Sequence, residues 1–277
     1  MRVLLFGGTG QLGSELLAQG TSKGWTIHAP SVDEVDIQNV EAIKRIIAGA
    51  PPDLIINAAG YHGLASAERE PQKALAINFI AVANIAILAQ TYQIPFITYS
   101  TGYVFAGDKG DCYEEDDVPC PINAYGRSKY MGELLARRSA PQLATVIRTS
   151  VLFGGESFLL KILKKNKNKV KVSDEQIISP TYAKHLAAGT IQLIEKKAPA
   201  AIYHLVSEGA CSLAYLAMET IKLSGSSTKI IPVNSRGYRK GVHRPLNSSL
   251  RNVRARSLGV MFPSWQGALK EYLKSLS

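Results

Sequence analysis

The sequence predicts an α/β fold in which a doubly wound parallel sheet carries a smaller, interleaved C-terminal lobe. Over the first hundred residues, short apolar runs alternate with segments of helical periodicity in the order β-α-β-α-β, which is typical of parallel sheets with right-handed crossovers. The alternation weakens after residue 150. We therefore expect one domain over residues 1–150, to which residues 183–205 return, and a lobe built mainly from residues 151–277.

Length and composition fit a globular protein. The 277 residues suffice for a large core, and 46% hydrophobic with 19% charged residues is ordinary for a soluble chain. No unbroken apolar run reaches the roughly 18 residues of a membrane span, and residues 1–8 resemble a strand rather than a leader peptide. Because Cys112, Cys120 and Cys211 show no paired spacing, we expect a cytoplasmic protein without disulfides or membrane contact.

The chain is basic, with a formal net charge of +10. Lysines gather in segment 161–172, and further basic residues lie between Arg236 and Arg256. A basic surface attracts nucleic acids, anionic membranes or phosphorylated small molecules. Since no nucleic-acid motif accompanies the charge, we expect a solvated basic face or an anionic small substrate, and no nucleic-acid partner.

A glycine turn follows the first predicted strand. Residues 2–7, RVLLFG, form an apolar run that leads into GGTGQLG and then a helical pattern, so Gly7, Gly10 and Gly13 have the spacing G-x-x-G-x-x-G. The first glycine permits a tight turn, the second lets backbone approach a pyrophosphate, and the third lets helix pack on strand. This strand–turn–helix context predicts a Rossmann-type dinucleotide site at the helix N-terminus.

The second predicted strand, WTIHAPSV at 25–32, bears on the choice of cofactor. A carboxylate at the end of this strand usually binds the ribose 2′-hydroxyl of NAD. None occurs here before Asp33, which favours NADPH and leaves NADH as an alternative. Further buried strands are predicted at 54–60 and 94–101, with a helix at 72–92 between them. Because ligands bind at the carboxyl ends of parallel strands, one crevice should gather Gly7, Ala58, Ala59, Gly60, Ser100 and Thr101.

The stretch NAYGRSKYMG, residues 123–132, places Tyr125 and Lys129 four residues apart. On a helix both side chains lie on one face. A surface Tyr–Lys pair is one interpretation, and a catalytic acid with the cation that tunes it is the other. Reducing a ketone needs a hydride on carbon and a proton on oxygen. A cation close to a tyrosine favours the phenolate and lowers a pKa that is otherwise about 10.

The order of motifs resembles the dTDP-4-dehydrorhamnose reductase family, within the extended short-chain dehydrogenases/reductases. Matching stretches run through residues 1–277, among them GGTGQLGSEL, INAAGYHGLASAERE, STGYVFAGDKG, YGRSKYMGE and RPLNSSLRNVRARSLGV. The resemblance implies that Tyr125 is the catalytic acid, that Lys129 is its partner, and that Thr101 hydrogen-bonds near the substrate carbonyl. It also implies a cofactor site made by Gly7, Gly10, Gln11, Leu12, Gly13, Asp36, Ile37, Ala58, Ala59 and Tyr61, with Tyr125 and Lys129.

Three departures from the family pattern fall where the resemblance places the sugar. Gly102 stands for an aspartate, Ala65-Ser66 stand for Asp-Lys, and Val151 stands for a tryptophan. The loss of polar side chains that hydrogen-bond sugar hydroxyls alters the selectivity for the substrate. We therefore expect a variant keto sugar, which is a 4-keto-6-deoxyhexose or a heptose on a nucleotide. Tyr103 and Val151 are the candidate sugar contacts, and Arg244 is the candidate fork for a pyrophosphate.

These observations predict an NADPH-dependent reductase of a nucleotide-linked 4-keto sugar. Neither His62 nor His185 has a second ligand at metal spacing, so no protein-built metal site is predicted, and Asn78 is expected to brace its helix. Two alternatives stay open: a cofactor-binding regulatory subunit resembling the methionine adenosyltransferase β subunit, and a nucleotide-sugar epimerase or dehydratase. A homodimer is an open alternative for the assembly.

Overall fold

The computed structural model describes residues 1–155, 157–164, 169–234, 238–239 and 241–276. Arg236, Lys240, the side chain of Arg239 and part of the basic segment 161–172 lie outside the described residues, so the predictions about their charges are not taken further.

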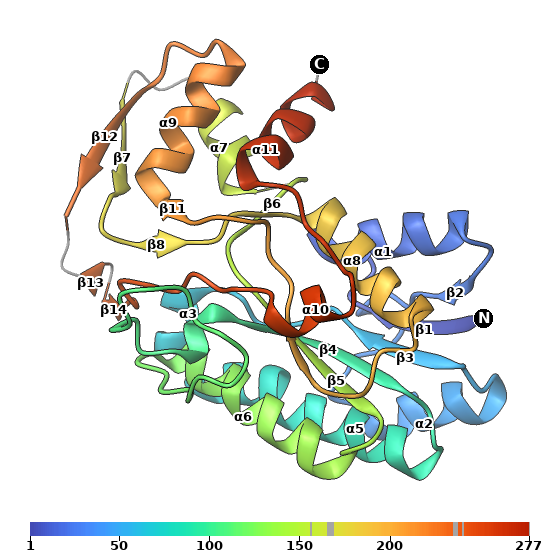
Figure 1. The fold of residues 1–277 in the computed structure, drawn as a ribbon. Coiled ribbons are helices and arrows are strands. Elements are labelled where there is room, and N and C mark those ends of the chain that lie inside the picture. Colours follow the sequence, from blue (N-terminus) through green and yellow to red (C-terminus); the bar gives the residue numbers. More distant parts are fainter. Residues whose placement is uncertain (156, 165–168, 235–237, 240, 277) are drawn as a thin grey trace.

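A six-stranded sheet forms the centre of the molecule, with all its strands parallel and in the order β10-β5-β4-β3-β1-β2 (Figure 1). Its inner strands are continuous apolar runs because both faces of the sheet are covered. The strands are β1 (Arg2–Phe6), β2 (Thr26–His28), β3 (Leu54–Asn57), β4 (Phe96–Thr101), β5 (Ala144–Thr149) and β10 (Ile202–His204). The predicted α/β fold with a parallel sheet is confirmed. The edge strand β2 is shorter than the predicted 25–32.

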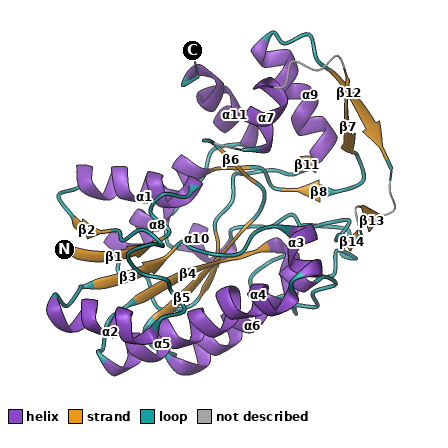
Figure 2. Cartoon of the chain, turned by 180° about the vertical axis from the view of Figure 1, so that it is seen from behind, coloured by secondary structure: helices purple, strands orange, loops and turns teal. Residues whose placement is uncertain are grey.

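Helices cover both faces of this sheet. The alternating side chains of β1 divide between them: Val3 and Leu5 belong to the core beneath α1 and α8, and Leu4 and Phe6 to the core beneath α2, α5 and α6. Figure 2 shows the same three layers from behind. The helices are α1 (Gln11–Ser22), α2 (Val40–Gly49), α5 (Ala81–Thr91), α6 (Ala124–Ser139) and α8 (Ala183–Glu195).

One helical segment runs without a break from Pro71 to Thr91. It comprises α4 (Pro71–Leu75), a π-helical turn (Ala76–Ile80) and α5. By length and composition it could cross a membrane, with a mean hydropathy of 1.8, although it contains no unbroken apolar run of about 18 residues. Half of its most apolar window is buried inside the protein, as expected of a core helix packed on a sheet.

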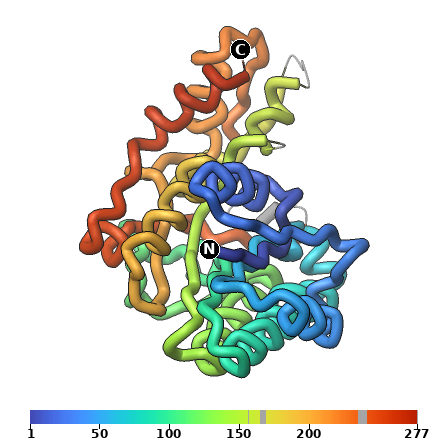
Figure 3. The backbone as a smooth tube through the Cα atoms, turned by 90° about the vertical axis from the view of Figure 1, so that its right-hand side faces the viewer, coloured from blue at the N-terminus to red at the C-terminus, as the bar shows by residue number. Residues whose placement is uncertain are grey.

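The smaller lobe stands above the carboxyl ends of the strands. It contains α7 (Phe158–Lys164), α9 (Leu213–Ser224), α11 (Trp265–Lys274), the parallel pair β7 (Lys169–Ser173) and β12 (Lys229–Val233), and the antiparallel pair β8 (Ile177–Ile178) and β11 (Cys211–Ser212). Figure 3 shows the N-terminus at the sheet and the C-terminus at the far end of this lobe.

The chain passes between the two parts several times. Strand β6 (Leu152–Phe153) leaves the sheet and pairs with β9 (Thr181–Tyr182), after which α8 packs on α1 and β10 pairs with β5. Helix α10 (Val253–Ser257) packs on β10, so residues 253–262 lie with the sheet, although they fall in the range predicted to form mainly the lobe.

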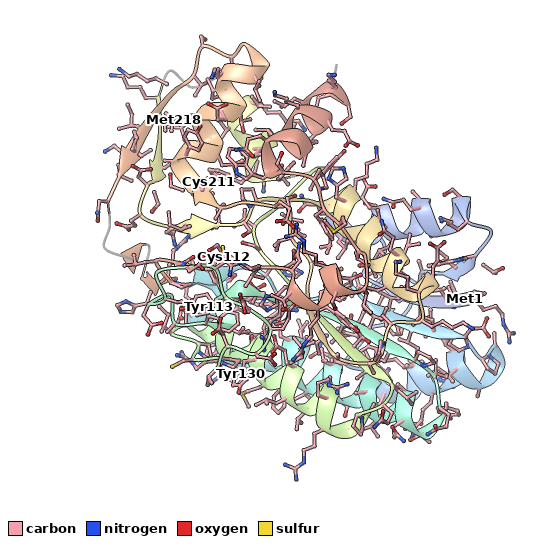
Figure 4. All side chains as sticks on the ribbon, in the orientation of Figure 1. Met1, Cys112, Tyr113, Tyr130, Cys211 and Met218 are labelled. Carbon is pink, nitrogen blue, oxygen red and sulfur yellow. The ribbon has the colours of Figure 1, made fainter. Side chains whose placement is uncertain are left out.

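Short elements and free thiols complete the description. The remaining helix α3 (Leu64–Arg69) precedes α4, a short 3-10 turn (Gly102–Val104) follows β4, and β13 (Tyr238–Arg239) pairs with β14 (Val242–His243). Cys112, Cys120 and Cys211 are all free; Figure 4 labels Cys112 near the sheet and Cys211 in the smaller lobe.

Candidate active site

The glycine turn after β1 brings three pieces of backbone into close contact. Gly7 has a φ of +78°, and a Cβ there would lie 2.5 Å from the Ala59 amide nitrogen. A Cβ on Gly13 would lie 2.0 Å from the Gly7 carbonyl oxygen. Since neither clash can be relieved without moving backbone, both positions require glycine. The turn is closed by the Gly10 amide, which donates to the Gly7 oxygen over 3.0 Å.

Helix α1 begins directly after this turn and faces the carboxyl edge of the sheet with its N-terminus. Gly10 is its N-cap, no side chain caps it, and its first turn contains no acidic residue. Its unpaired N–H groups and helix dipole therefore favour an anion. Gln11, the first residue of the helix, donates through its side-chain amide to the carbonyl oxygen of Gly154 and so ties α1 to the smaller lobe.

The tip of β2 carries a carboxylate that the linear sequence does not suggest. Glu34 folds back, and its Oε2 accepts a hydrogen bond from the Ser31 amide over 2.7 Å. That hydrogen bond lowers the pKa of Glu34, which is therefore ionised at neutral pH. No carboxylate precedes Asp33 in the sequence, but the carboxylate of Glu34, a later residue, returns to this tip.

A cavity of about 350 Å³ lies at the carboxyl ends of β1, β3, β4 and β5. It extends from the glycine turn to the first turns of α6. Its walls include seven of the residues predicted for the cofactor or the chemistry, namely Gly10, Gln11, Leu12, Ala58, Thr101, Tyr125 and Lys129, and five that were not, namely His62, Tyr99, Thr149, Ser150 and Leu152. Ser100 also lines it, and within the described part of the chain its buried Oγ has no hydrogen-bond partner.

Six other predicted cofactor residues do not line this cavity: Gly7 and Gly13, which form the glycine turn, and Asp36, Ile37, Ala59 and Tyr61. Asp36 is exposed, and its carboxylate accepts from the amide and the side chain of Gln38. Ile37 is buried in the core beneath α2. Ala59 packs against the same core. The hydroxyl of Tyr61 donates to Glu70 over 2.8 Å and so points toward the end of α3.

Helix α6 holds Tyr125 and Lys129 on successive turns that face the cavity. Asn123 fixes its start by accepting a hydrogen bond from the Gly126 amide over 2.8 Å. The Tyr125 hydroxyl hydrogen-bonds the side chain of Thr101 at the end of β4. Lys129 is 6% exposed, and its Nζ donates to the Tyr99 carbonyl oxygen over 2.8 Å. The prediction that Tyr125 and Lys129 share a helix face is confirmed.

Burial sets the charge state of both groups. It raises the pKa of Tyr125 to about 12, although the hydrogen bond with Thr101 lowers it. This is opposite to the lowering expected from a neighbouring lysine, because loss of solvation is the largest cause of the shift and the charge of Lys129 is not among its causes. Burial also lowers the pKa of Lys129 to about 8, and the charge of Glu133 partly restores it. At neutral pH the site therefore holds a protonated phenol beside a marginally stable ammonium.

Asn78 holds this arrangement from behind. It lies in the π-helical turn and is 1% exposed. Its Oδ1 accepts from the Tyr61 amide over 2.8 Å, and its Nδ2 donates to the Tyr61 carbonyl oxygen and to Ser128 Oγ, each over 3.0 Å. Asn78 thus braces the loop after β3 against α6 rather than facing the cavity, as the sequence suggests.

A second, smaller cavity of about 170 Å³ adjoins the first on the side of the smaller lobe. The two share His62, Thr101, Tyr125 and Ser150. The second is also lined by Tyr103 and Val151, two of the three residues predicted for the sugar, and by Leu64, Gly102 and Ser248. The geometry therefore places Tyr125 where a dinucleotide end and a second molecule could meet.

Arg244, the third residue predicted for the substrate, lies behind Tyr103. The Tyr103 hydroxyl hydrogen-bonds the side chains of Gln176 and Arg244, while burial raises the Tyr103 pKa. Among the described residues, the buried Nε of Arg244 and Nε2 of Gln176 find no hydrogen-bond partner. Gln176 is 4% exposed. Neither Arg244 nor Gln176 lines the two cavities, and Tyr103, which lines the second one, is their contact toward it.

Position 102 is a glycine in this chain because of a close contact with the backbone. A Cβ at this position would lie 2.4 Å from the Ser248 carbonyl oxygen, so an aspartate does not fit here without moving the segment around Ser248. Ser150 could have been predicted as a site residue from the sequence, because it follows the end of β5. Ser248 could not have been predicted in this way, because it lies about a hundred residues further along the chain.

Gly102→Ala is expected to lower kcat/KM at least 10-fold and the free energy of unfolding by about 1–3 kcal/mol, because the added methyl group overpacks the contact with Ser248. Thermal unfolding and steady-state kinetics measure both. Gly110→Ala is the matched control, since a Cβ there meets nothing within 4 Å. Equal behaviour of the two variants would show that the Ser248 contact does not constrain the site.

The described residues contain no group of three His, Cys, Asp or Glu side chains placed to hold a metal ion. His185 pairs instead with Glu271 over 2.8 Å. His62 lines both cavities, which the sequence reasoning missed because it considered this histidine only as a metal ligand.

Comparisons with known proteins agree with this architecture. A family model described as the RmlD substrate binding domain matches residues 1–277. The spore coat polysaccharide biosynthesis protein SpsK of Bacillus subtilis is 33% identical over 280 residues, covering 100% of this chain and 98% of that protein. A dTDP-4-dehydrorhamnose reductase of Burkholderia thailandensis is 32% identical, covering 97% of each chain.

Among solved structures, the dTDP-4-dehydrorhamnose reductase of Bacillus anthracis in complex with NADP aligns with a TM-score of 0.94 and 29% identity, covering 99% of each chain. The family model and the relatives span the sheet and the smaller lobe alike, so the likeness is not confined to the glycine turn. The resemblance predicted from the motifs is confirmed: the chain belongs to the RmlD substrate binding domain family, together with dTDP-4-dehydrorhamnose reductases.

Proposed function

We propose that this chain reduces the 4-keto group of a nucleotide-activated deoxy sugar with NADPH, in deoxysugar or cell-surface polysaccharide biosynthesis in the cytoplasm. The observation that carries the proposal is that Thr101, Tyr125 and Lys129 meet at one cavity, which starts at the glycine turn and opens into a second cavity. The names of the relatives support the reaction, and the NADP complex of the Bacillus anthracis reductase supports the cofactor.

The residues present fit a dinucleotide. The turn leaves room for backbone to approach a pyrophosphate, the N-terminus of α1 favours its charge, and Ser100 offers a hydroxyl without a partner among the described residues. The residues that would hold the cofactor are Gly7, Gly10, Gln11, Leu12 and Gly13 at the pyrophosphate, Asp36 and Ile37 at the adenine, and Ala58, Ala59 and Tyr61 along the remainder. We assign them to residues 1–150 with 183–205, and the substrate mainly to 151–277.

Bound NADPH supplies a hydride to the carbonyl carbon, and the protein supplies the proton. The Tyr125 hydroxyl, protonated at neutral pH, donates to the carbonyl oxygen as the C=O double bond becomes a C–O single bond. Thr101 orients that oxygen and stabilises the negative charge that develops on it. Lys129 stabilises the phenolate that remains and holds the cofactor ribose, and water then returns a proton to Tyr125.

The substrate side is proposed to use Tyr103, Val151 and Arg244. Tyr103 and Val151 line the second cavity, where the sugar ring would lie. Arg244 reaches the Tyr103 hydroxyl, and its guanidinium suits the pyrophosphate of a nucleotide sugar. The valine at 151 leaves more room than the tryptophan of the family pattern, and the glycine at 102 removes the carboxylate contact of that pattern, which supports a variant keto sugar.

NADPH oxidation with a panel of nucleotide-linked 4-keto sugars tests the proposal, with NADH as the alternative cofactor. We expect stoichiometric oxidation with at least one 4-keto-6-deoxyhexose. An epimerase or a dehydratase would convert sugar without net oxidation. Tight NADPH binding with no conversion of any sugar would instead indicate the regulatory subunit.

The pH dependence of kcat/KM should follow the protonation state of Lys129. Burial lowers its pKa to about 8, so the ammonium is present below that pH and is lost as pH rises through it. We expect the reductase rate to fall above about pH 8, and Lys129→Met to be slow at every pH. Measurements between pH 6 and 10 check this. A flat wild-type profile across that range would mean that the reaction does not need the ammonium.

A further inference from the structure

His62 occupies the junction of the two cavities. It follows β3 by five residues and lines both the cavity assigned to the cofactor and the one assigned to the sugar. Its ring folds back over Gly60: a Cβ on that glycine would lie 3.0 Å from His62 Cε1 and 3.2 Å from Nε2. Any larger residue at 60 would therefore press on the imidazole. The backbone of the loop thus directs this ring toward the cavities.

The ring faces Tyr125. The centroids of the two rings are 6.5 Å apart, with an angle of 59° between their planes. Tyr103 approaches Tyr125 at 6.1 Å and 75°. The phenol is thus bordered by His62 and Tyr103, and all three line the second cavity.

The imidazole is neutral and available. His62 is exposed where it lines the two cavities, and partial loss of solvation together with the charge of Lys129 lowers its pKa below its ordinary value. At neutral pH one ring nitrogen therefore donates and the other accepts. Within the described part of the chain, neither nitrogen has a hydrogen-bond partner. Lining positions 64, 102 and 151 are a leucine, a glycine and a valine, which offer no side-chain hydrogen bond to a sugar. Besides Thr101, Tyr103 and Tyr125, the other polar side chains of this cavity are the hydroxyls of Ser150 and Ser248, so His62 supplies its imidazole.

We propose that His62 determines substrate specificity by hydrogen-bonding the hydroxyl on the sugar carbon next to the ketone. This inference rests on the proposed function. In a 4-keto-6-deoxyhexose, C5 carries the methyl group and the ring oxygen, so C3 carries the only hydroxyl adjacent to the reacting carbon. A group that borders Tyr125 and holds this hydroxyl fixes which face of the ketone meets the hydride. The proposed contact takes the place of the polar contacts absent at Ala65 and Ser66, neither of which lines the second cavity.

The test compares two variants on two sugars. His62→Phe keeps a planar ring and removes the hydrogen bonds, whereas His62→Gln keeps a donor and an acceptor. With a nucleotide-linked 4-keto sugar that carries the 3-hydroxyl, we expect His62→Phe to lower kcat/KM by about 10- to 100-fold, mainly through KM. His62→Gln should retain most of the activity. With the 3-deoxy analogue, wild type and both variants should be alike.

The outcomes separate this inference from the proposed function. If wild type turns over keto sugars but His62→Phe lowers kcat/KM equally on both sugars, His62 only shapes the cavity and the inference is overturned. An unchanged kcat/KM of His62→Phe on both sugars overturns it as well. If wild type binds NADPH and reduces no keto sugar, the proposed function fails first. NADPH binding by His62→Phe, followed by fluorescence, checks that the variant is folded and that the cofactor cavity is intact.

Discussion

Tyr125→Phe is expected to lower kcat for the keto sugar by about 10²- to 10⁴-fold, the range that a positioned general acid contributes. The reason is chemical: phenylalanine fills the same space and has no proton to give. Burial raises the pKa of Tyr125 to about 12, so wild type carries that proton throughout the neutral range. KM for NADPH should change little, because the variant leaves the glycine turn and Lys129 in place. Steady-state kinetics with both substrates measure the two effects.

Tyr130→Phe is the control for this variant. It removes a hydroxyl from the same helix, α6, but from a residue that lines neither of the two cavities. Its kcat should equal that of wild type. If Tyr125→Phe kept more than a tenth of the activity, another donor would have to supply the proton, and the role proposed for Tyr125 would be wrong.

Glu133→Gln is expected to lower the free energy of unfolding by about 3–5 kcal/mol, the cost of leaving a buried charge without its partner. Glu133 and Arg148 form a salt bridge of 2.7 Å with both side chains 2% exposed. Arg148 Nε donates to both carboxylate oxygens at 3.0 and 3.1 Å. The amide keeps the shape and removes the charge, so the loss is electrostatic. Urea unfolding with an unchanged m-value measures it.

Glu41→Gln supplies the comparison. Glu41 pairs with Lys44 over 2.8 Å on the exposed face of α2, so its replacement should cost less than about 1 kcal/mol. Equal losses of unfolding free energy in the two variants would mean that the buried Glu133–Arg148 salt bridge contributes no more to stability than the exposed Glu41–Lys44 pair. Because the charge of Glu133 raises the pKa of Lys129, Glu133→Gln should also move the alkaline fall of the reductase rate to lower pH.

The parts of the site that could be predicted from sequence are those encoded by neighbouring residues. The glycine turn needs only seven consecutive residues, and the Tyr125–Lys129 face needs one helical turn. Both follow from local periodicity, and the apolar strands and helices between them follow from the alternation of patterns. Local patterns of this kind are enough to predict the parallel sheet, its carboxyl edge and the position of the chemistry on that edge.

What could not be predicted depends on segments far apart in the chain. The contact of Gly102 with Ser248 and the pairing of Glu133 with Arg148 arise from packing, which no local pattern encodes. The return of Glu34 to the tip of β2 comes from the turn in which the Glu34 amide donates to the Ser31 carbonyl oxygen and the Ser31 amide donates to the Glu34 carboxylate. The π-helical turn at Ala76–Ile80 adds one residue to a helical repeat, and a period of 3.6 does not reveal it. The lowering of the Tyr125 pKa was predicted wrongly because burial is invisible in a sequence.

The outer strand β10 has a consequence for how the chain is made. It closes the sheet beside β5, and Ala255 and Phe262 belong to the core on that side. A ribosome that has released the first 150 residues has therefore delivered the glycine turn, Tyr125 and Lys129, but neither the last strand of the sheet nor the residues that cover it. The sheet beside β5 cannot acquire its last strand and the cover on that side until residues 202–262 have also been released.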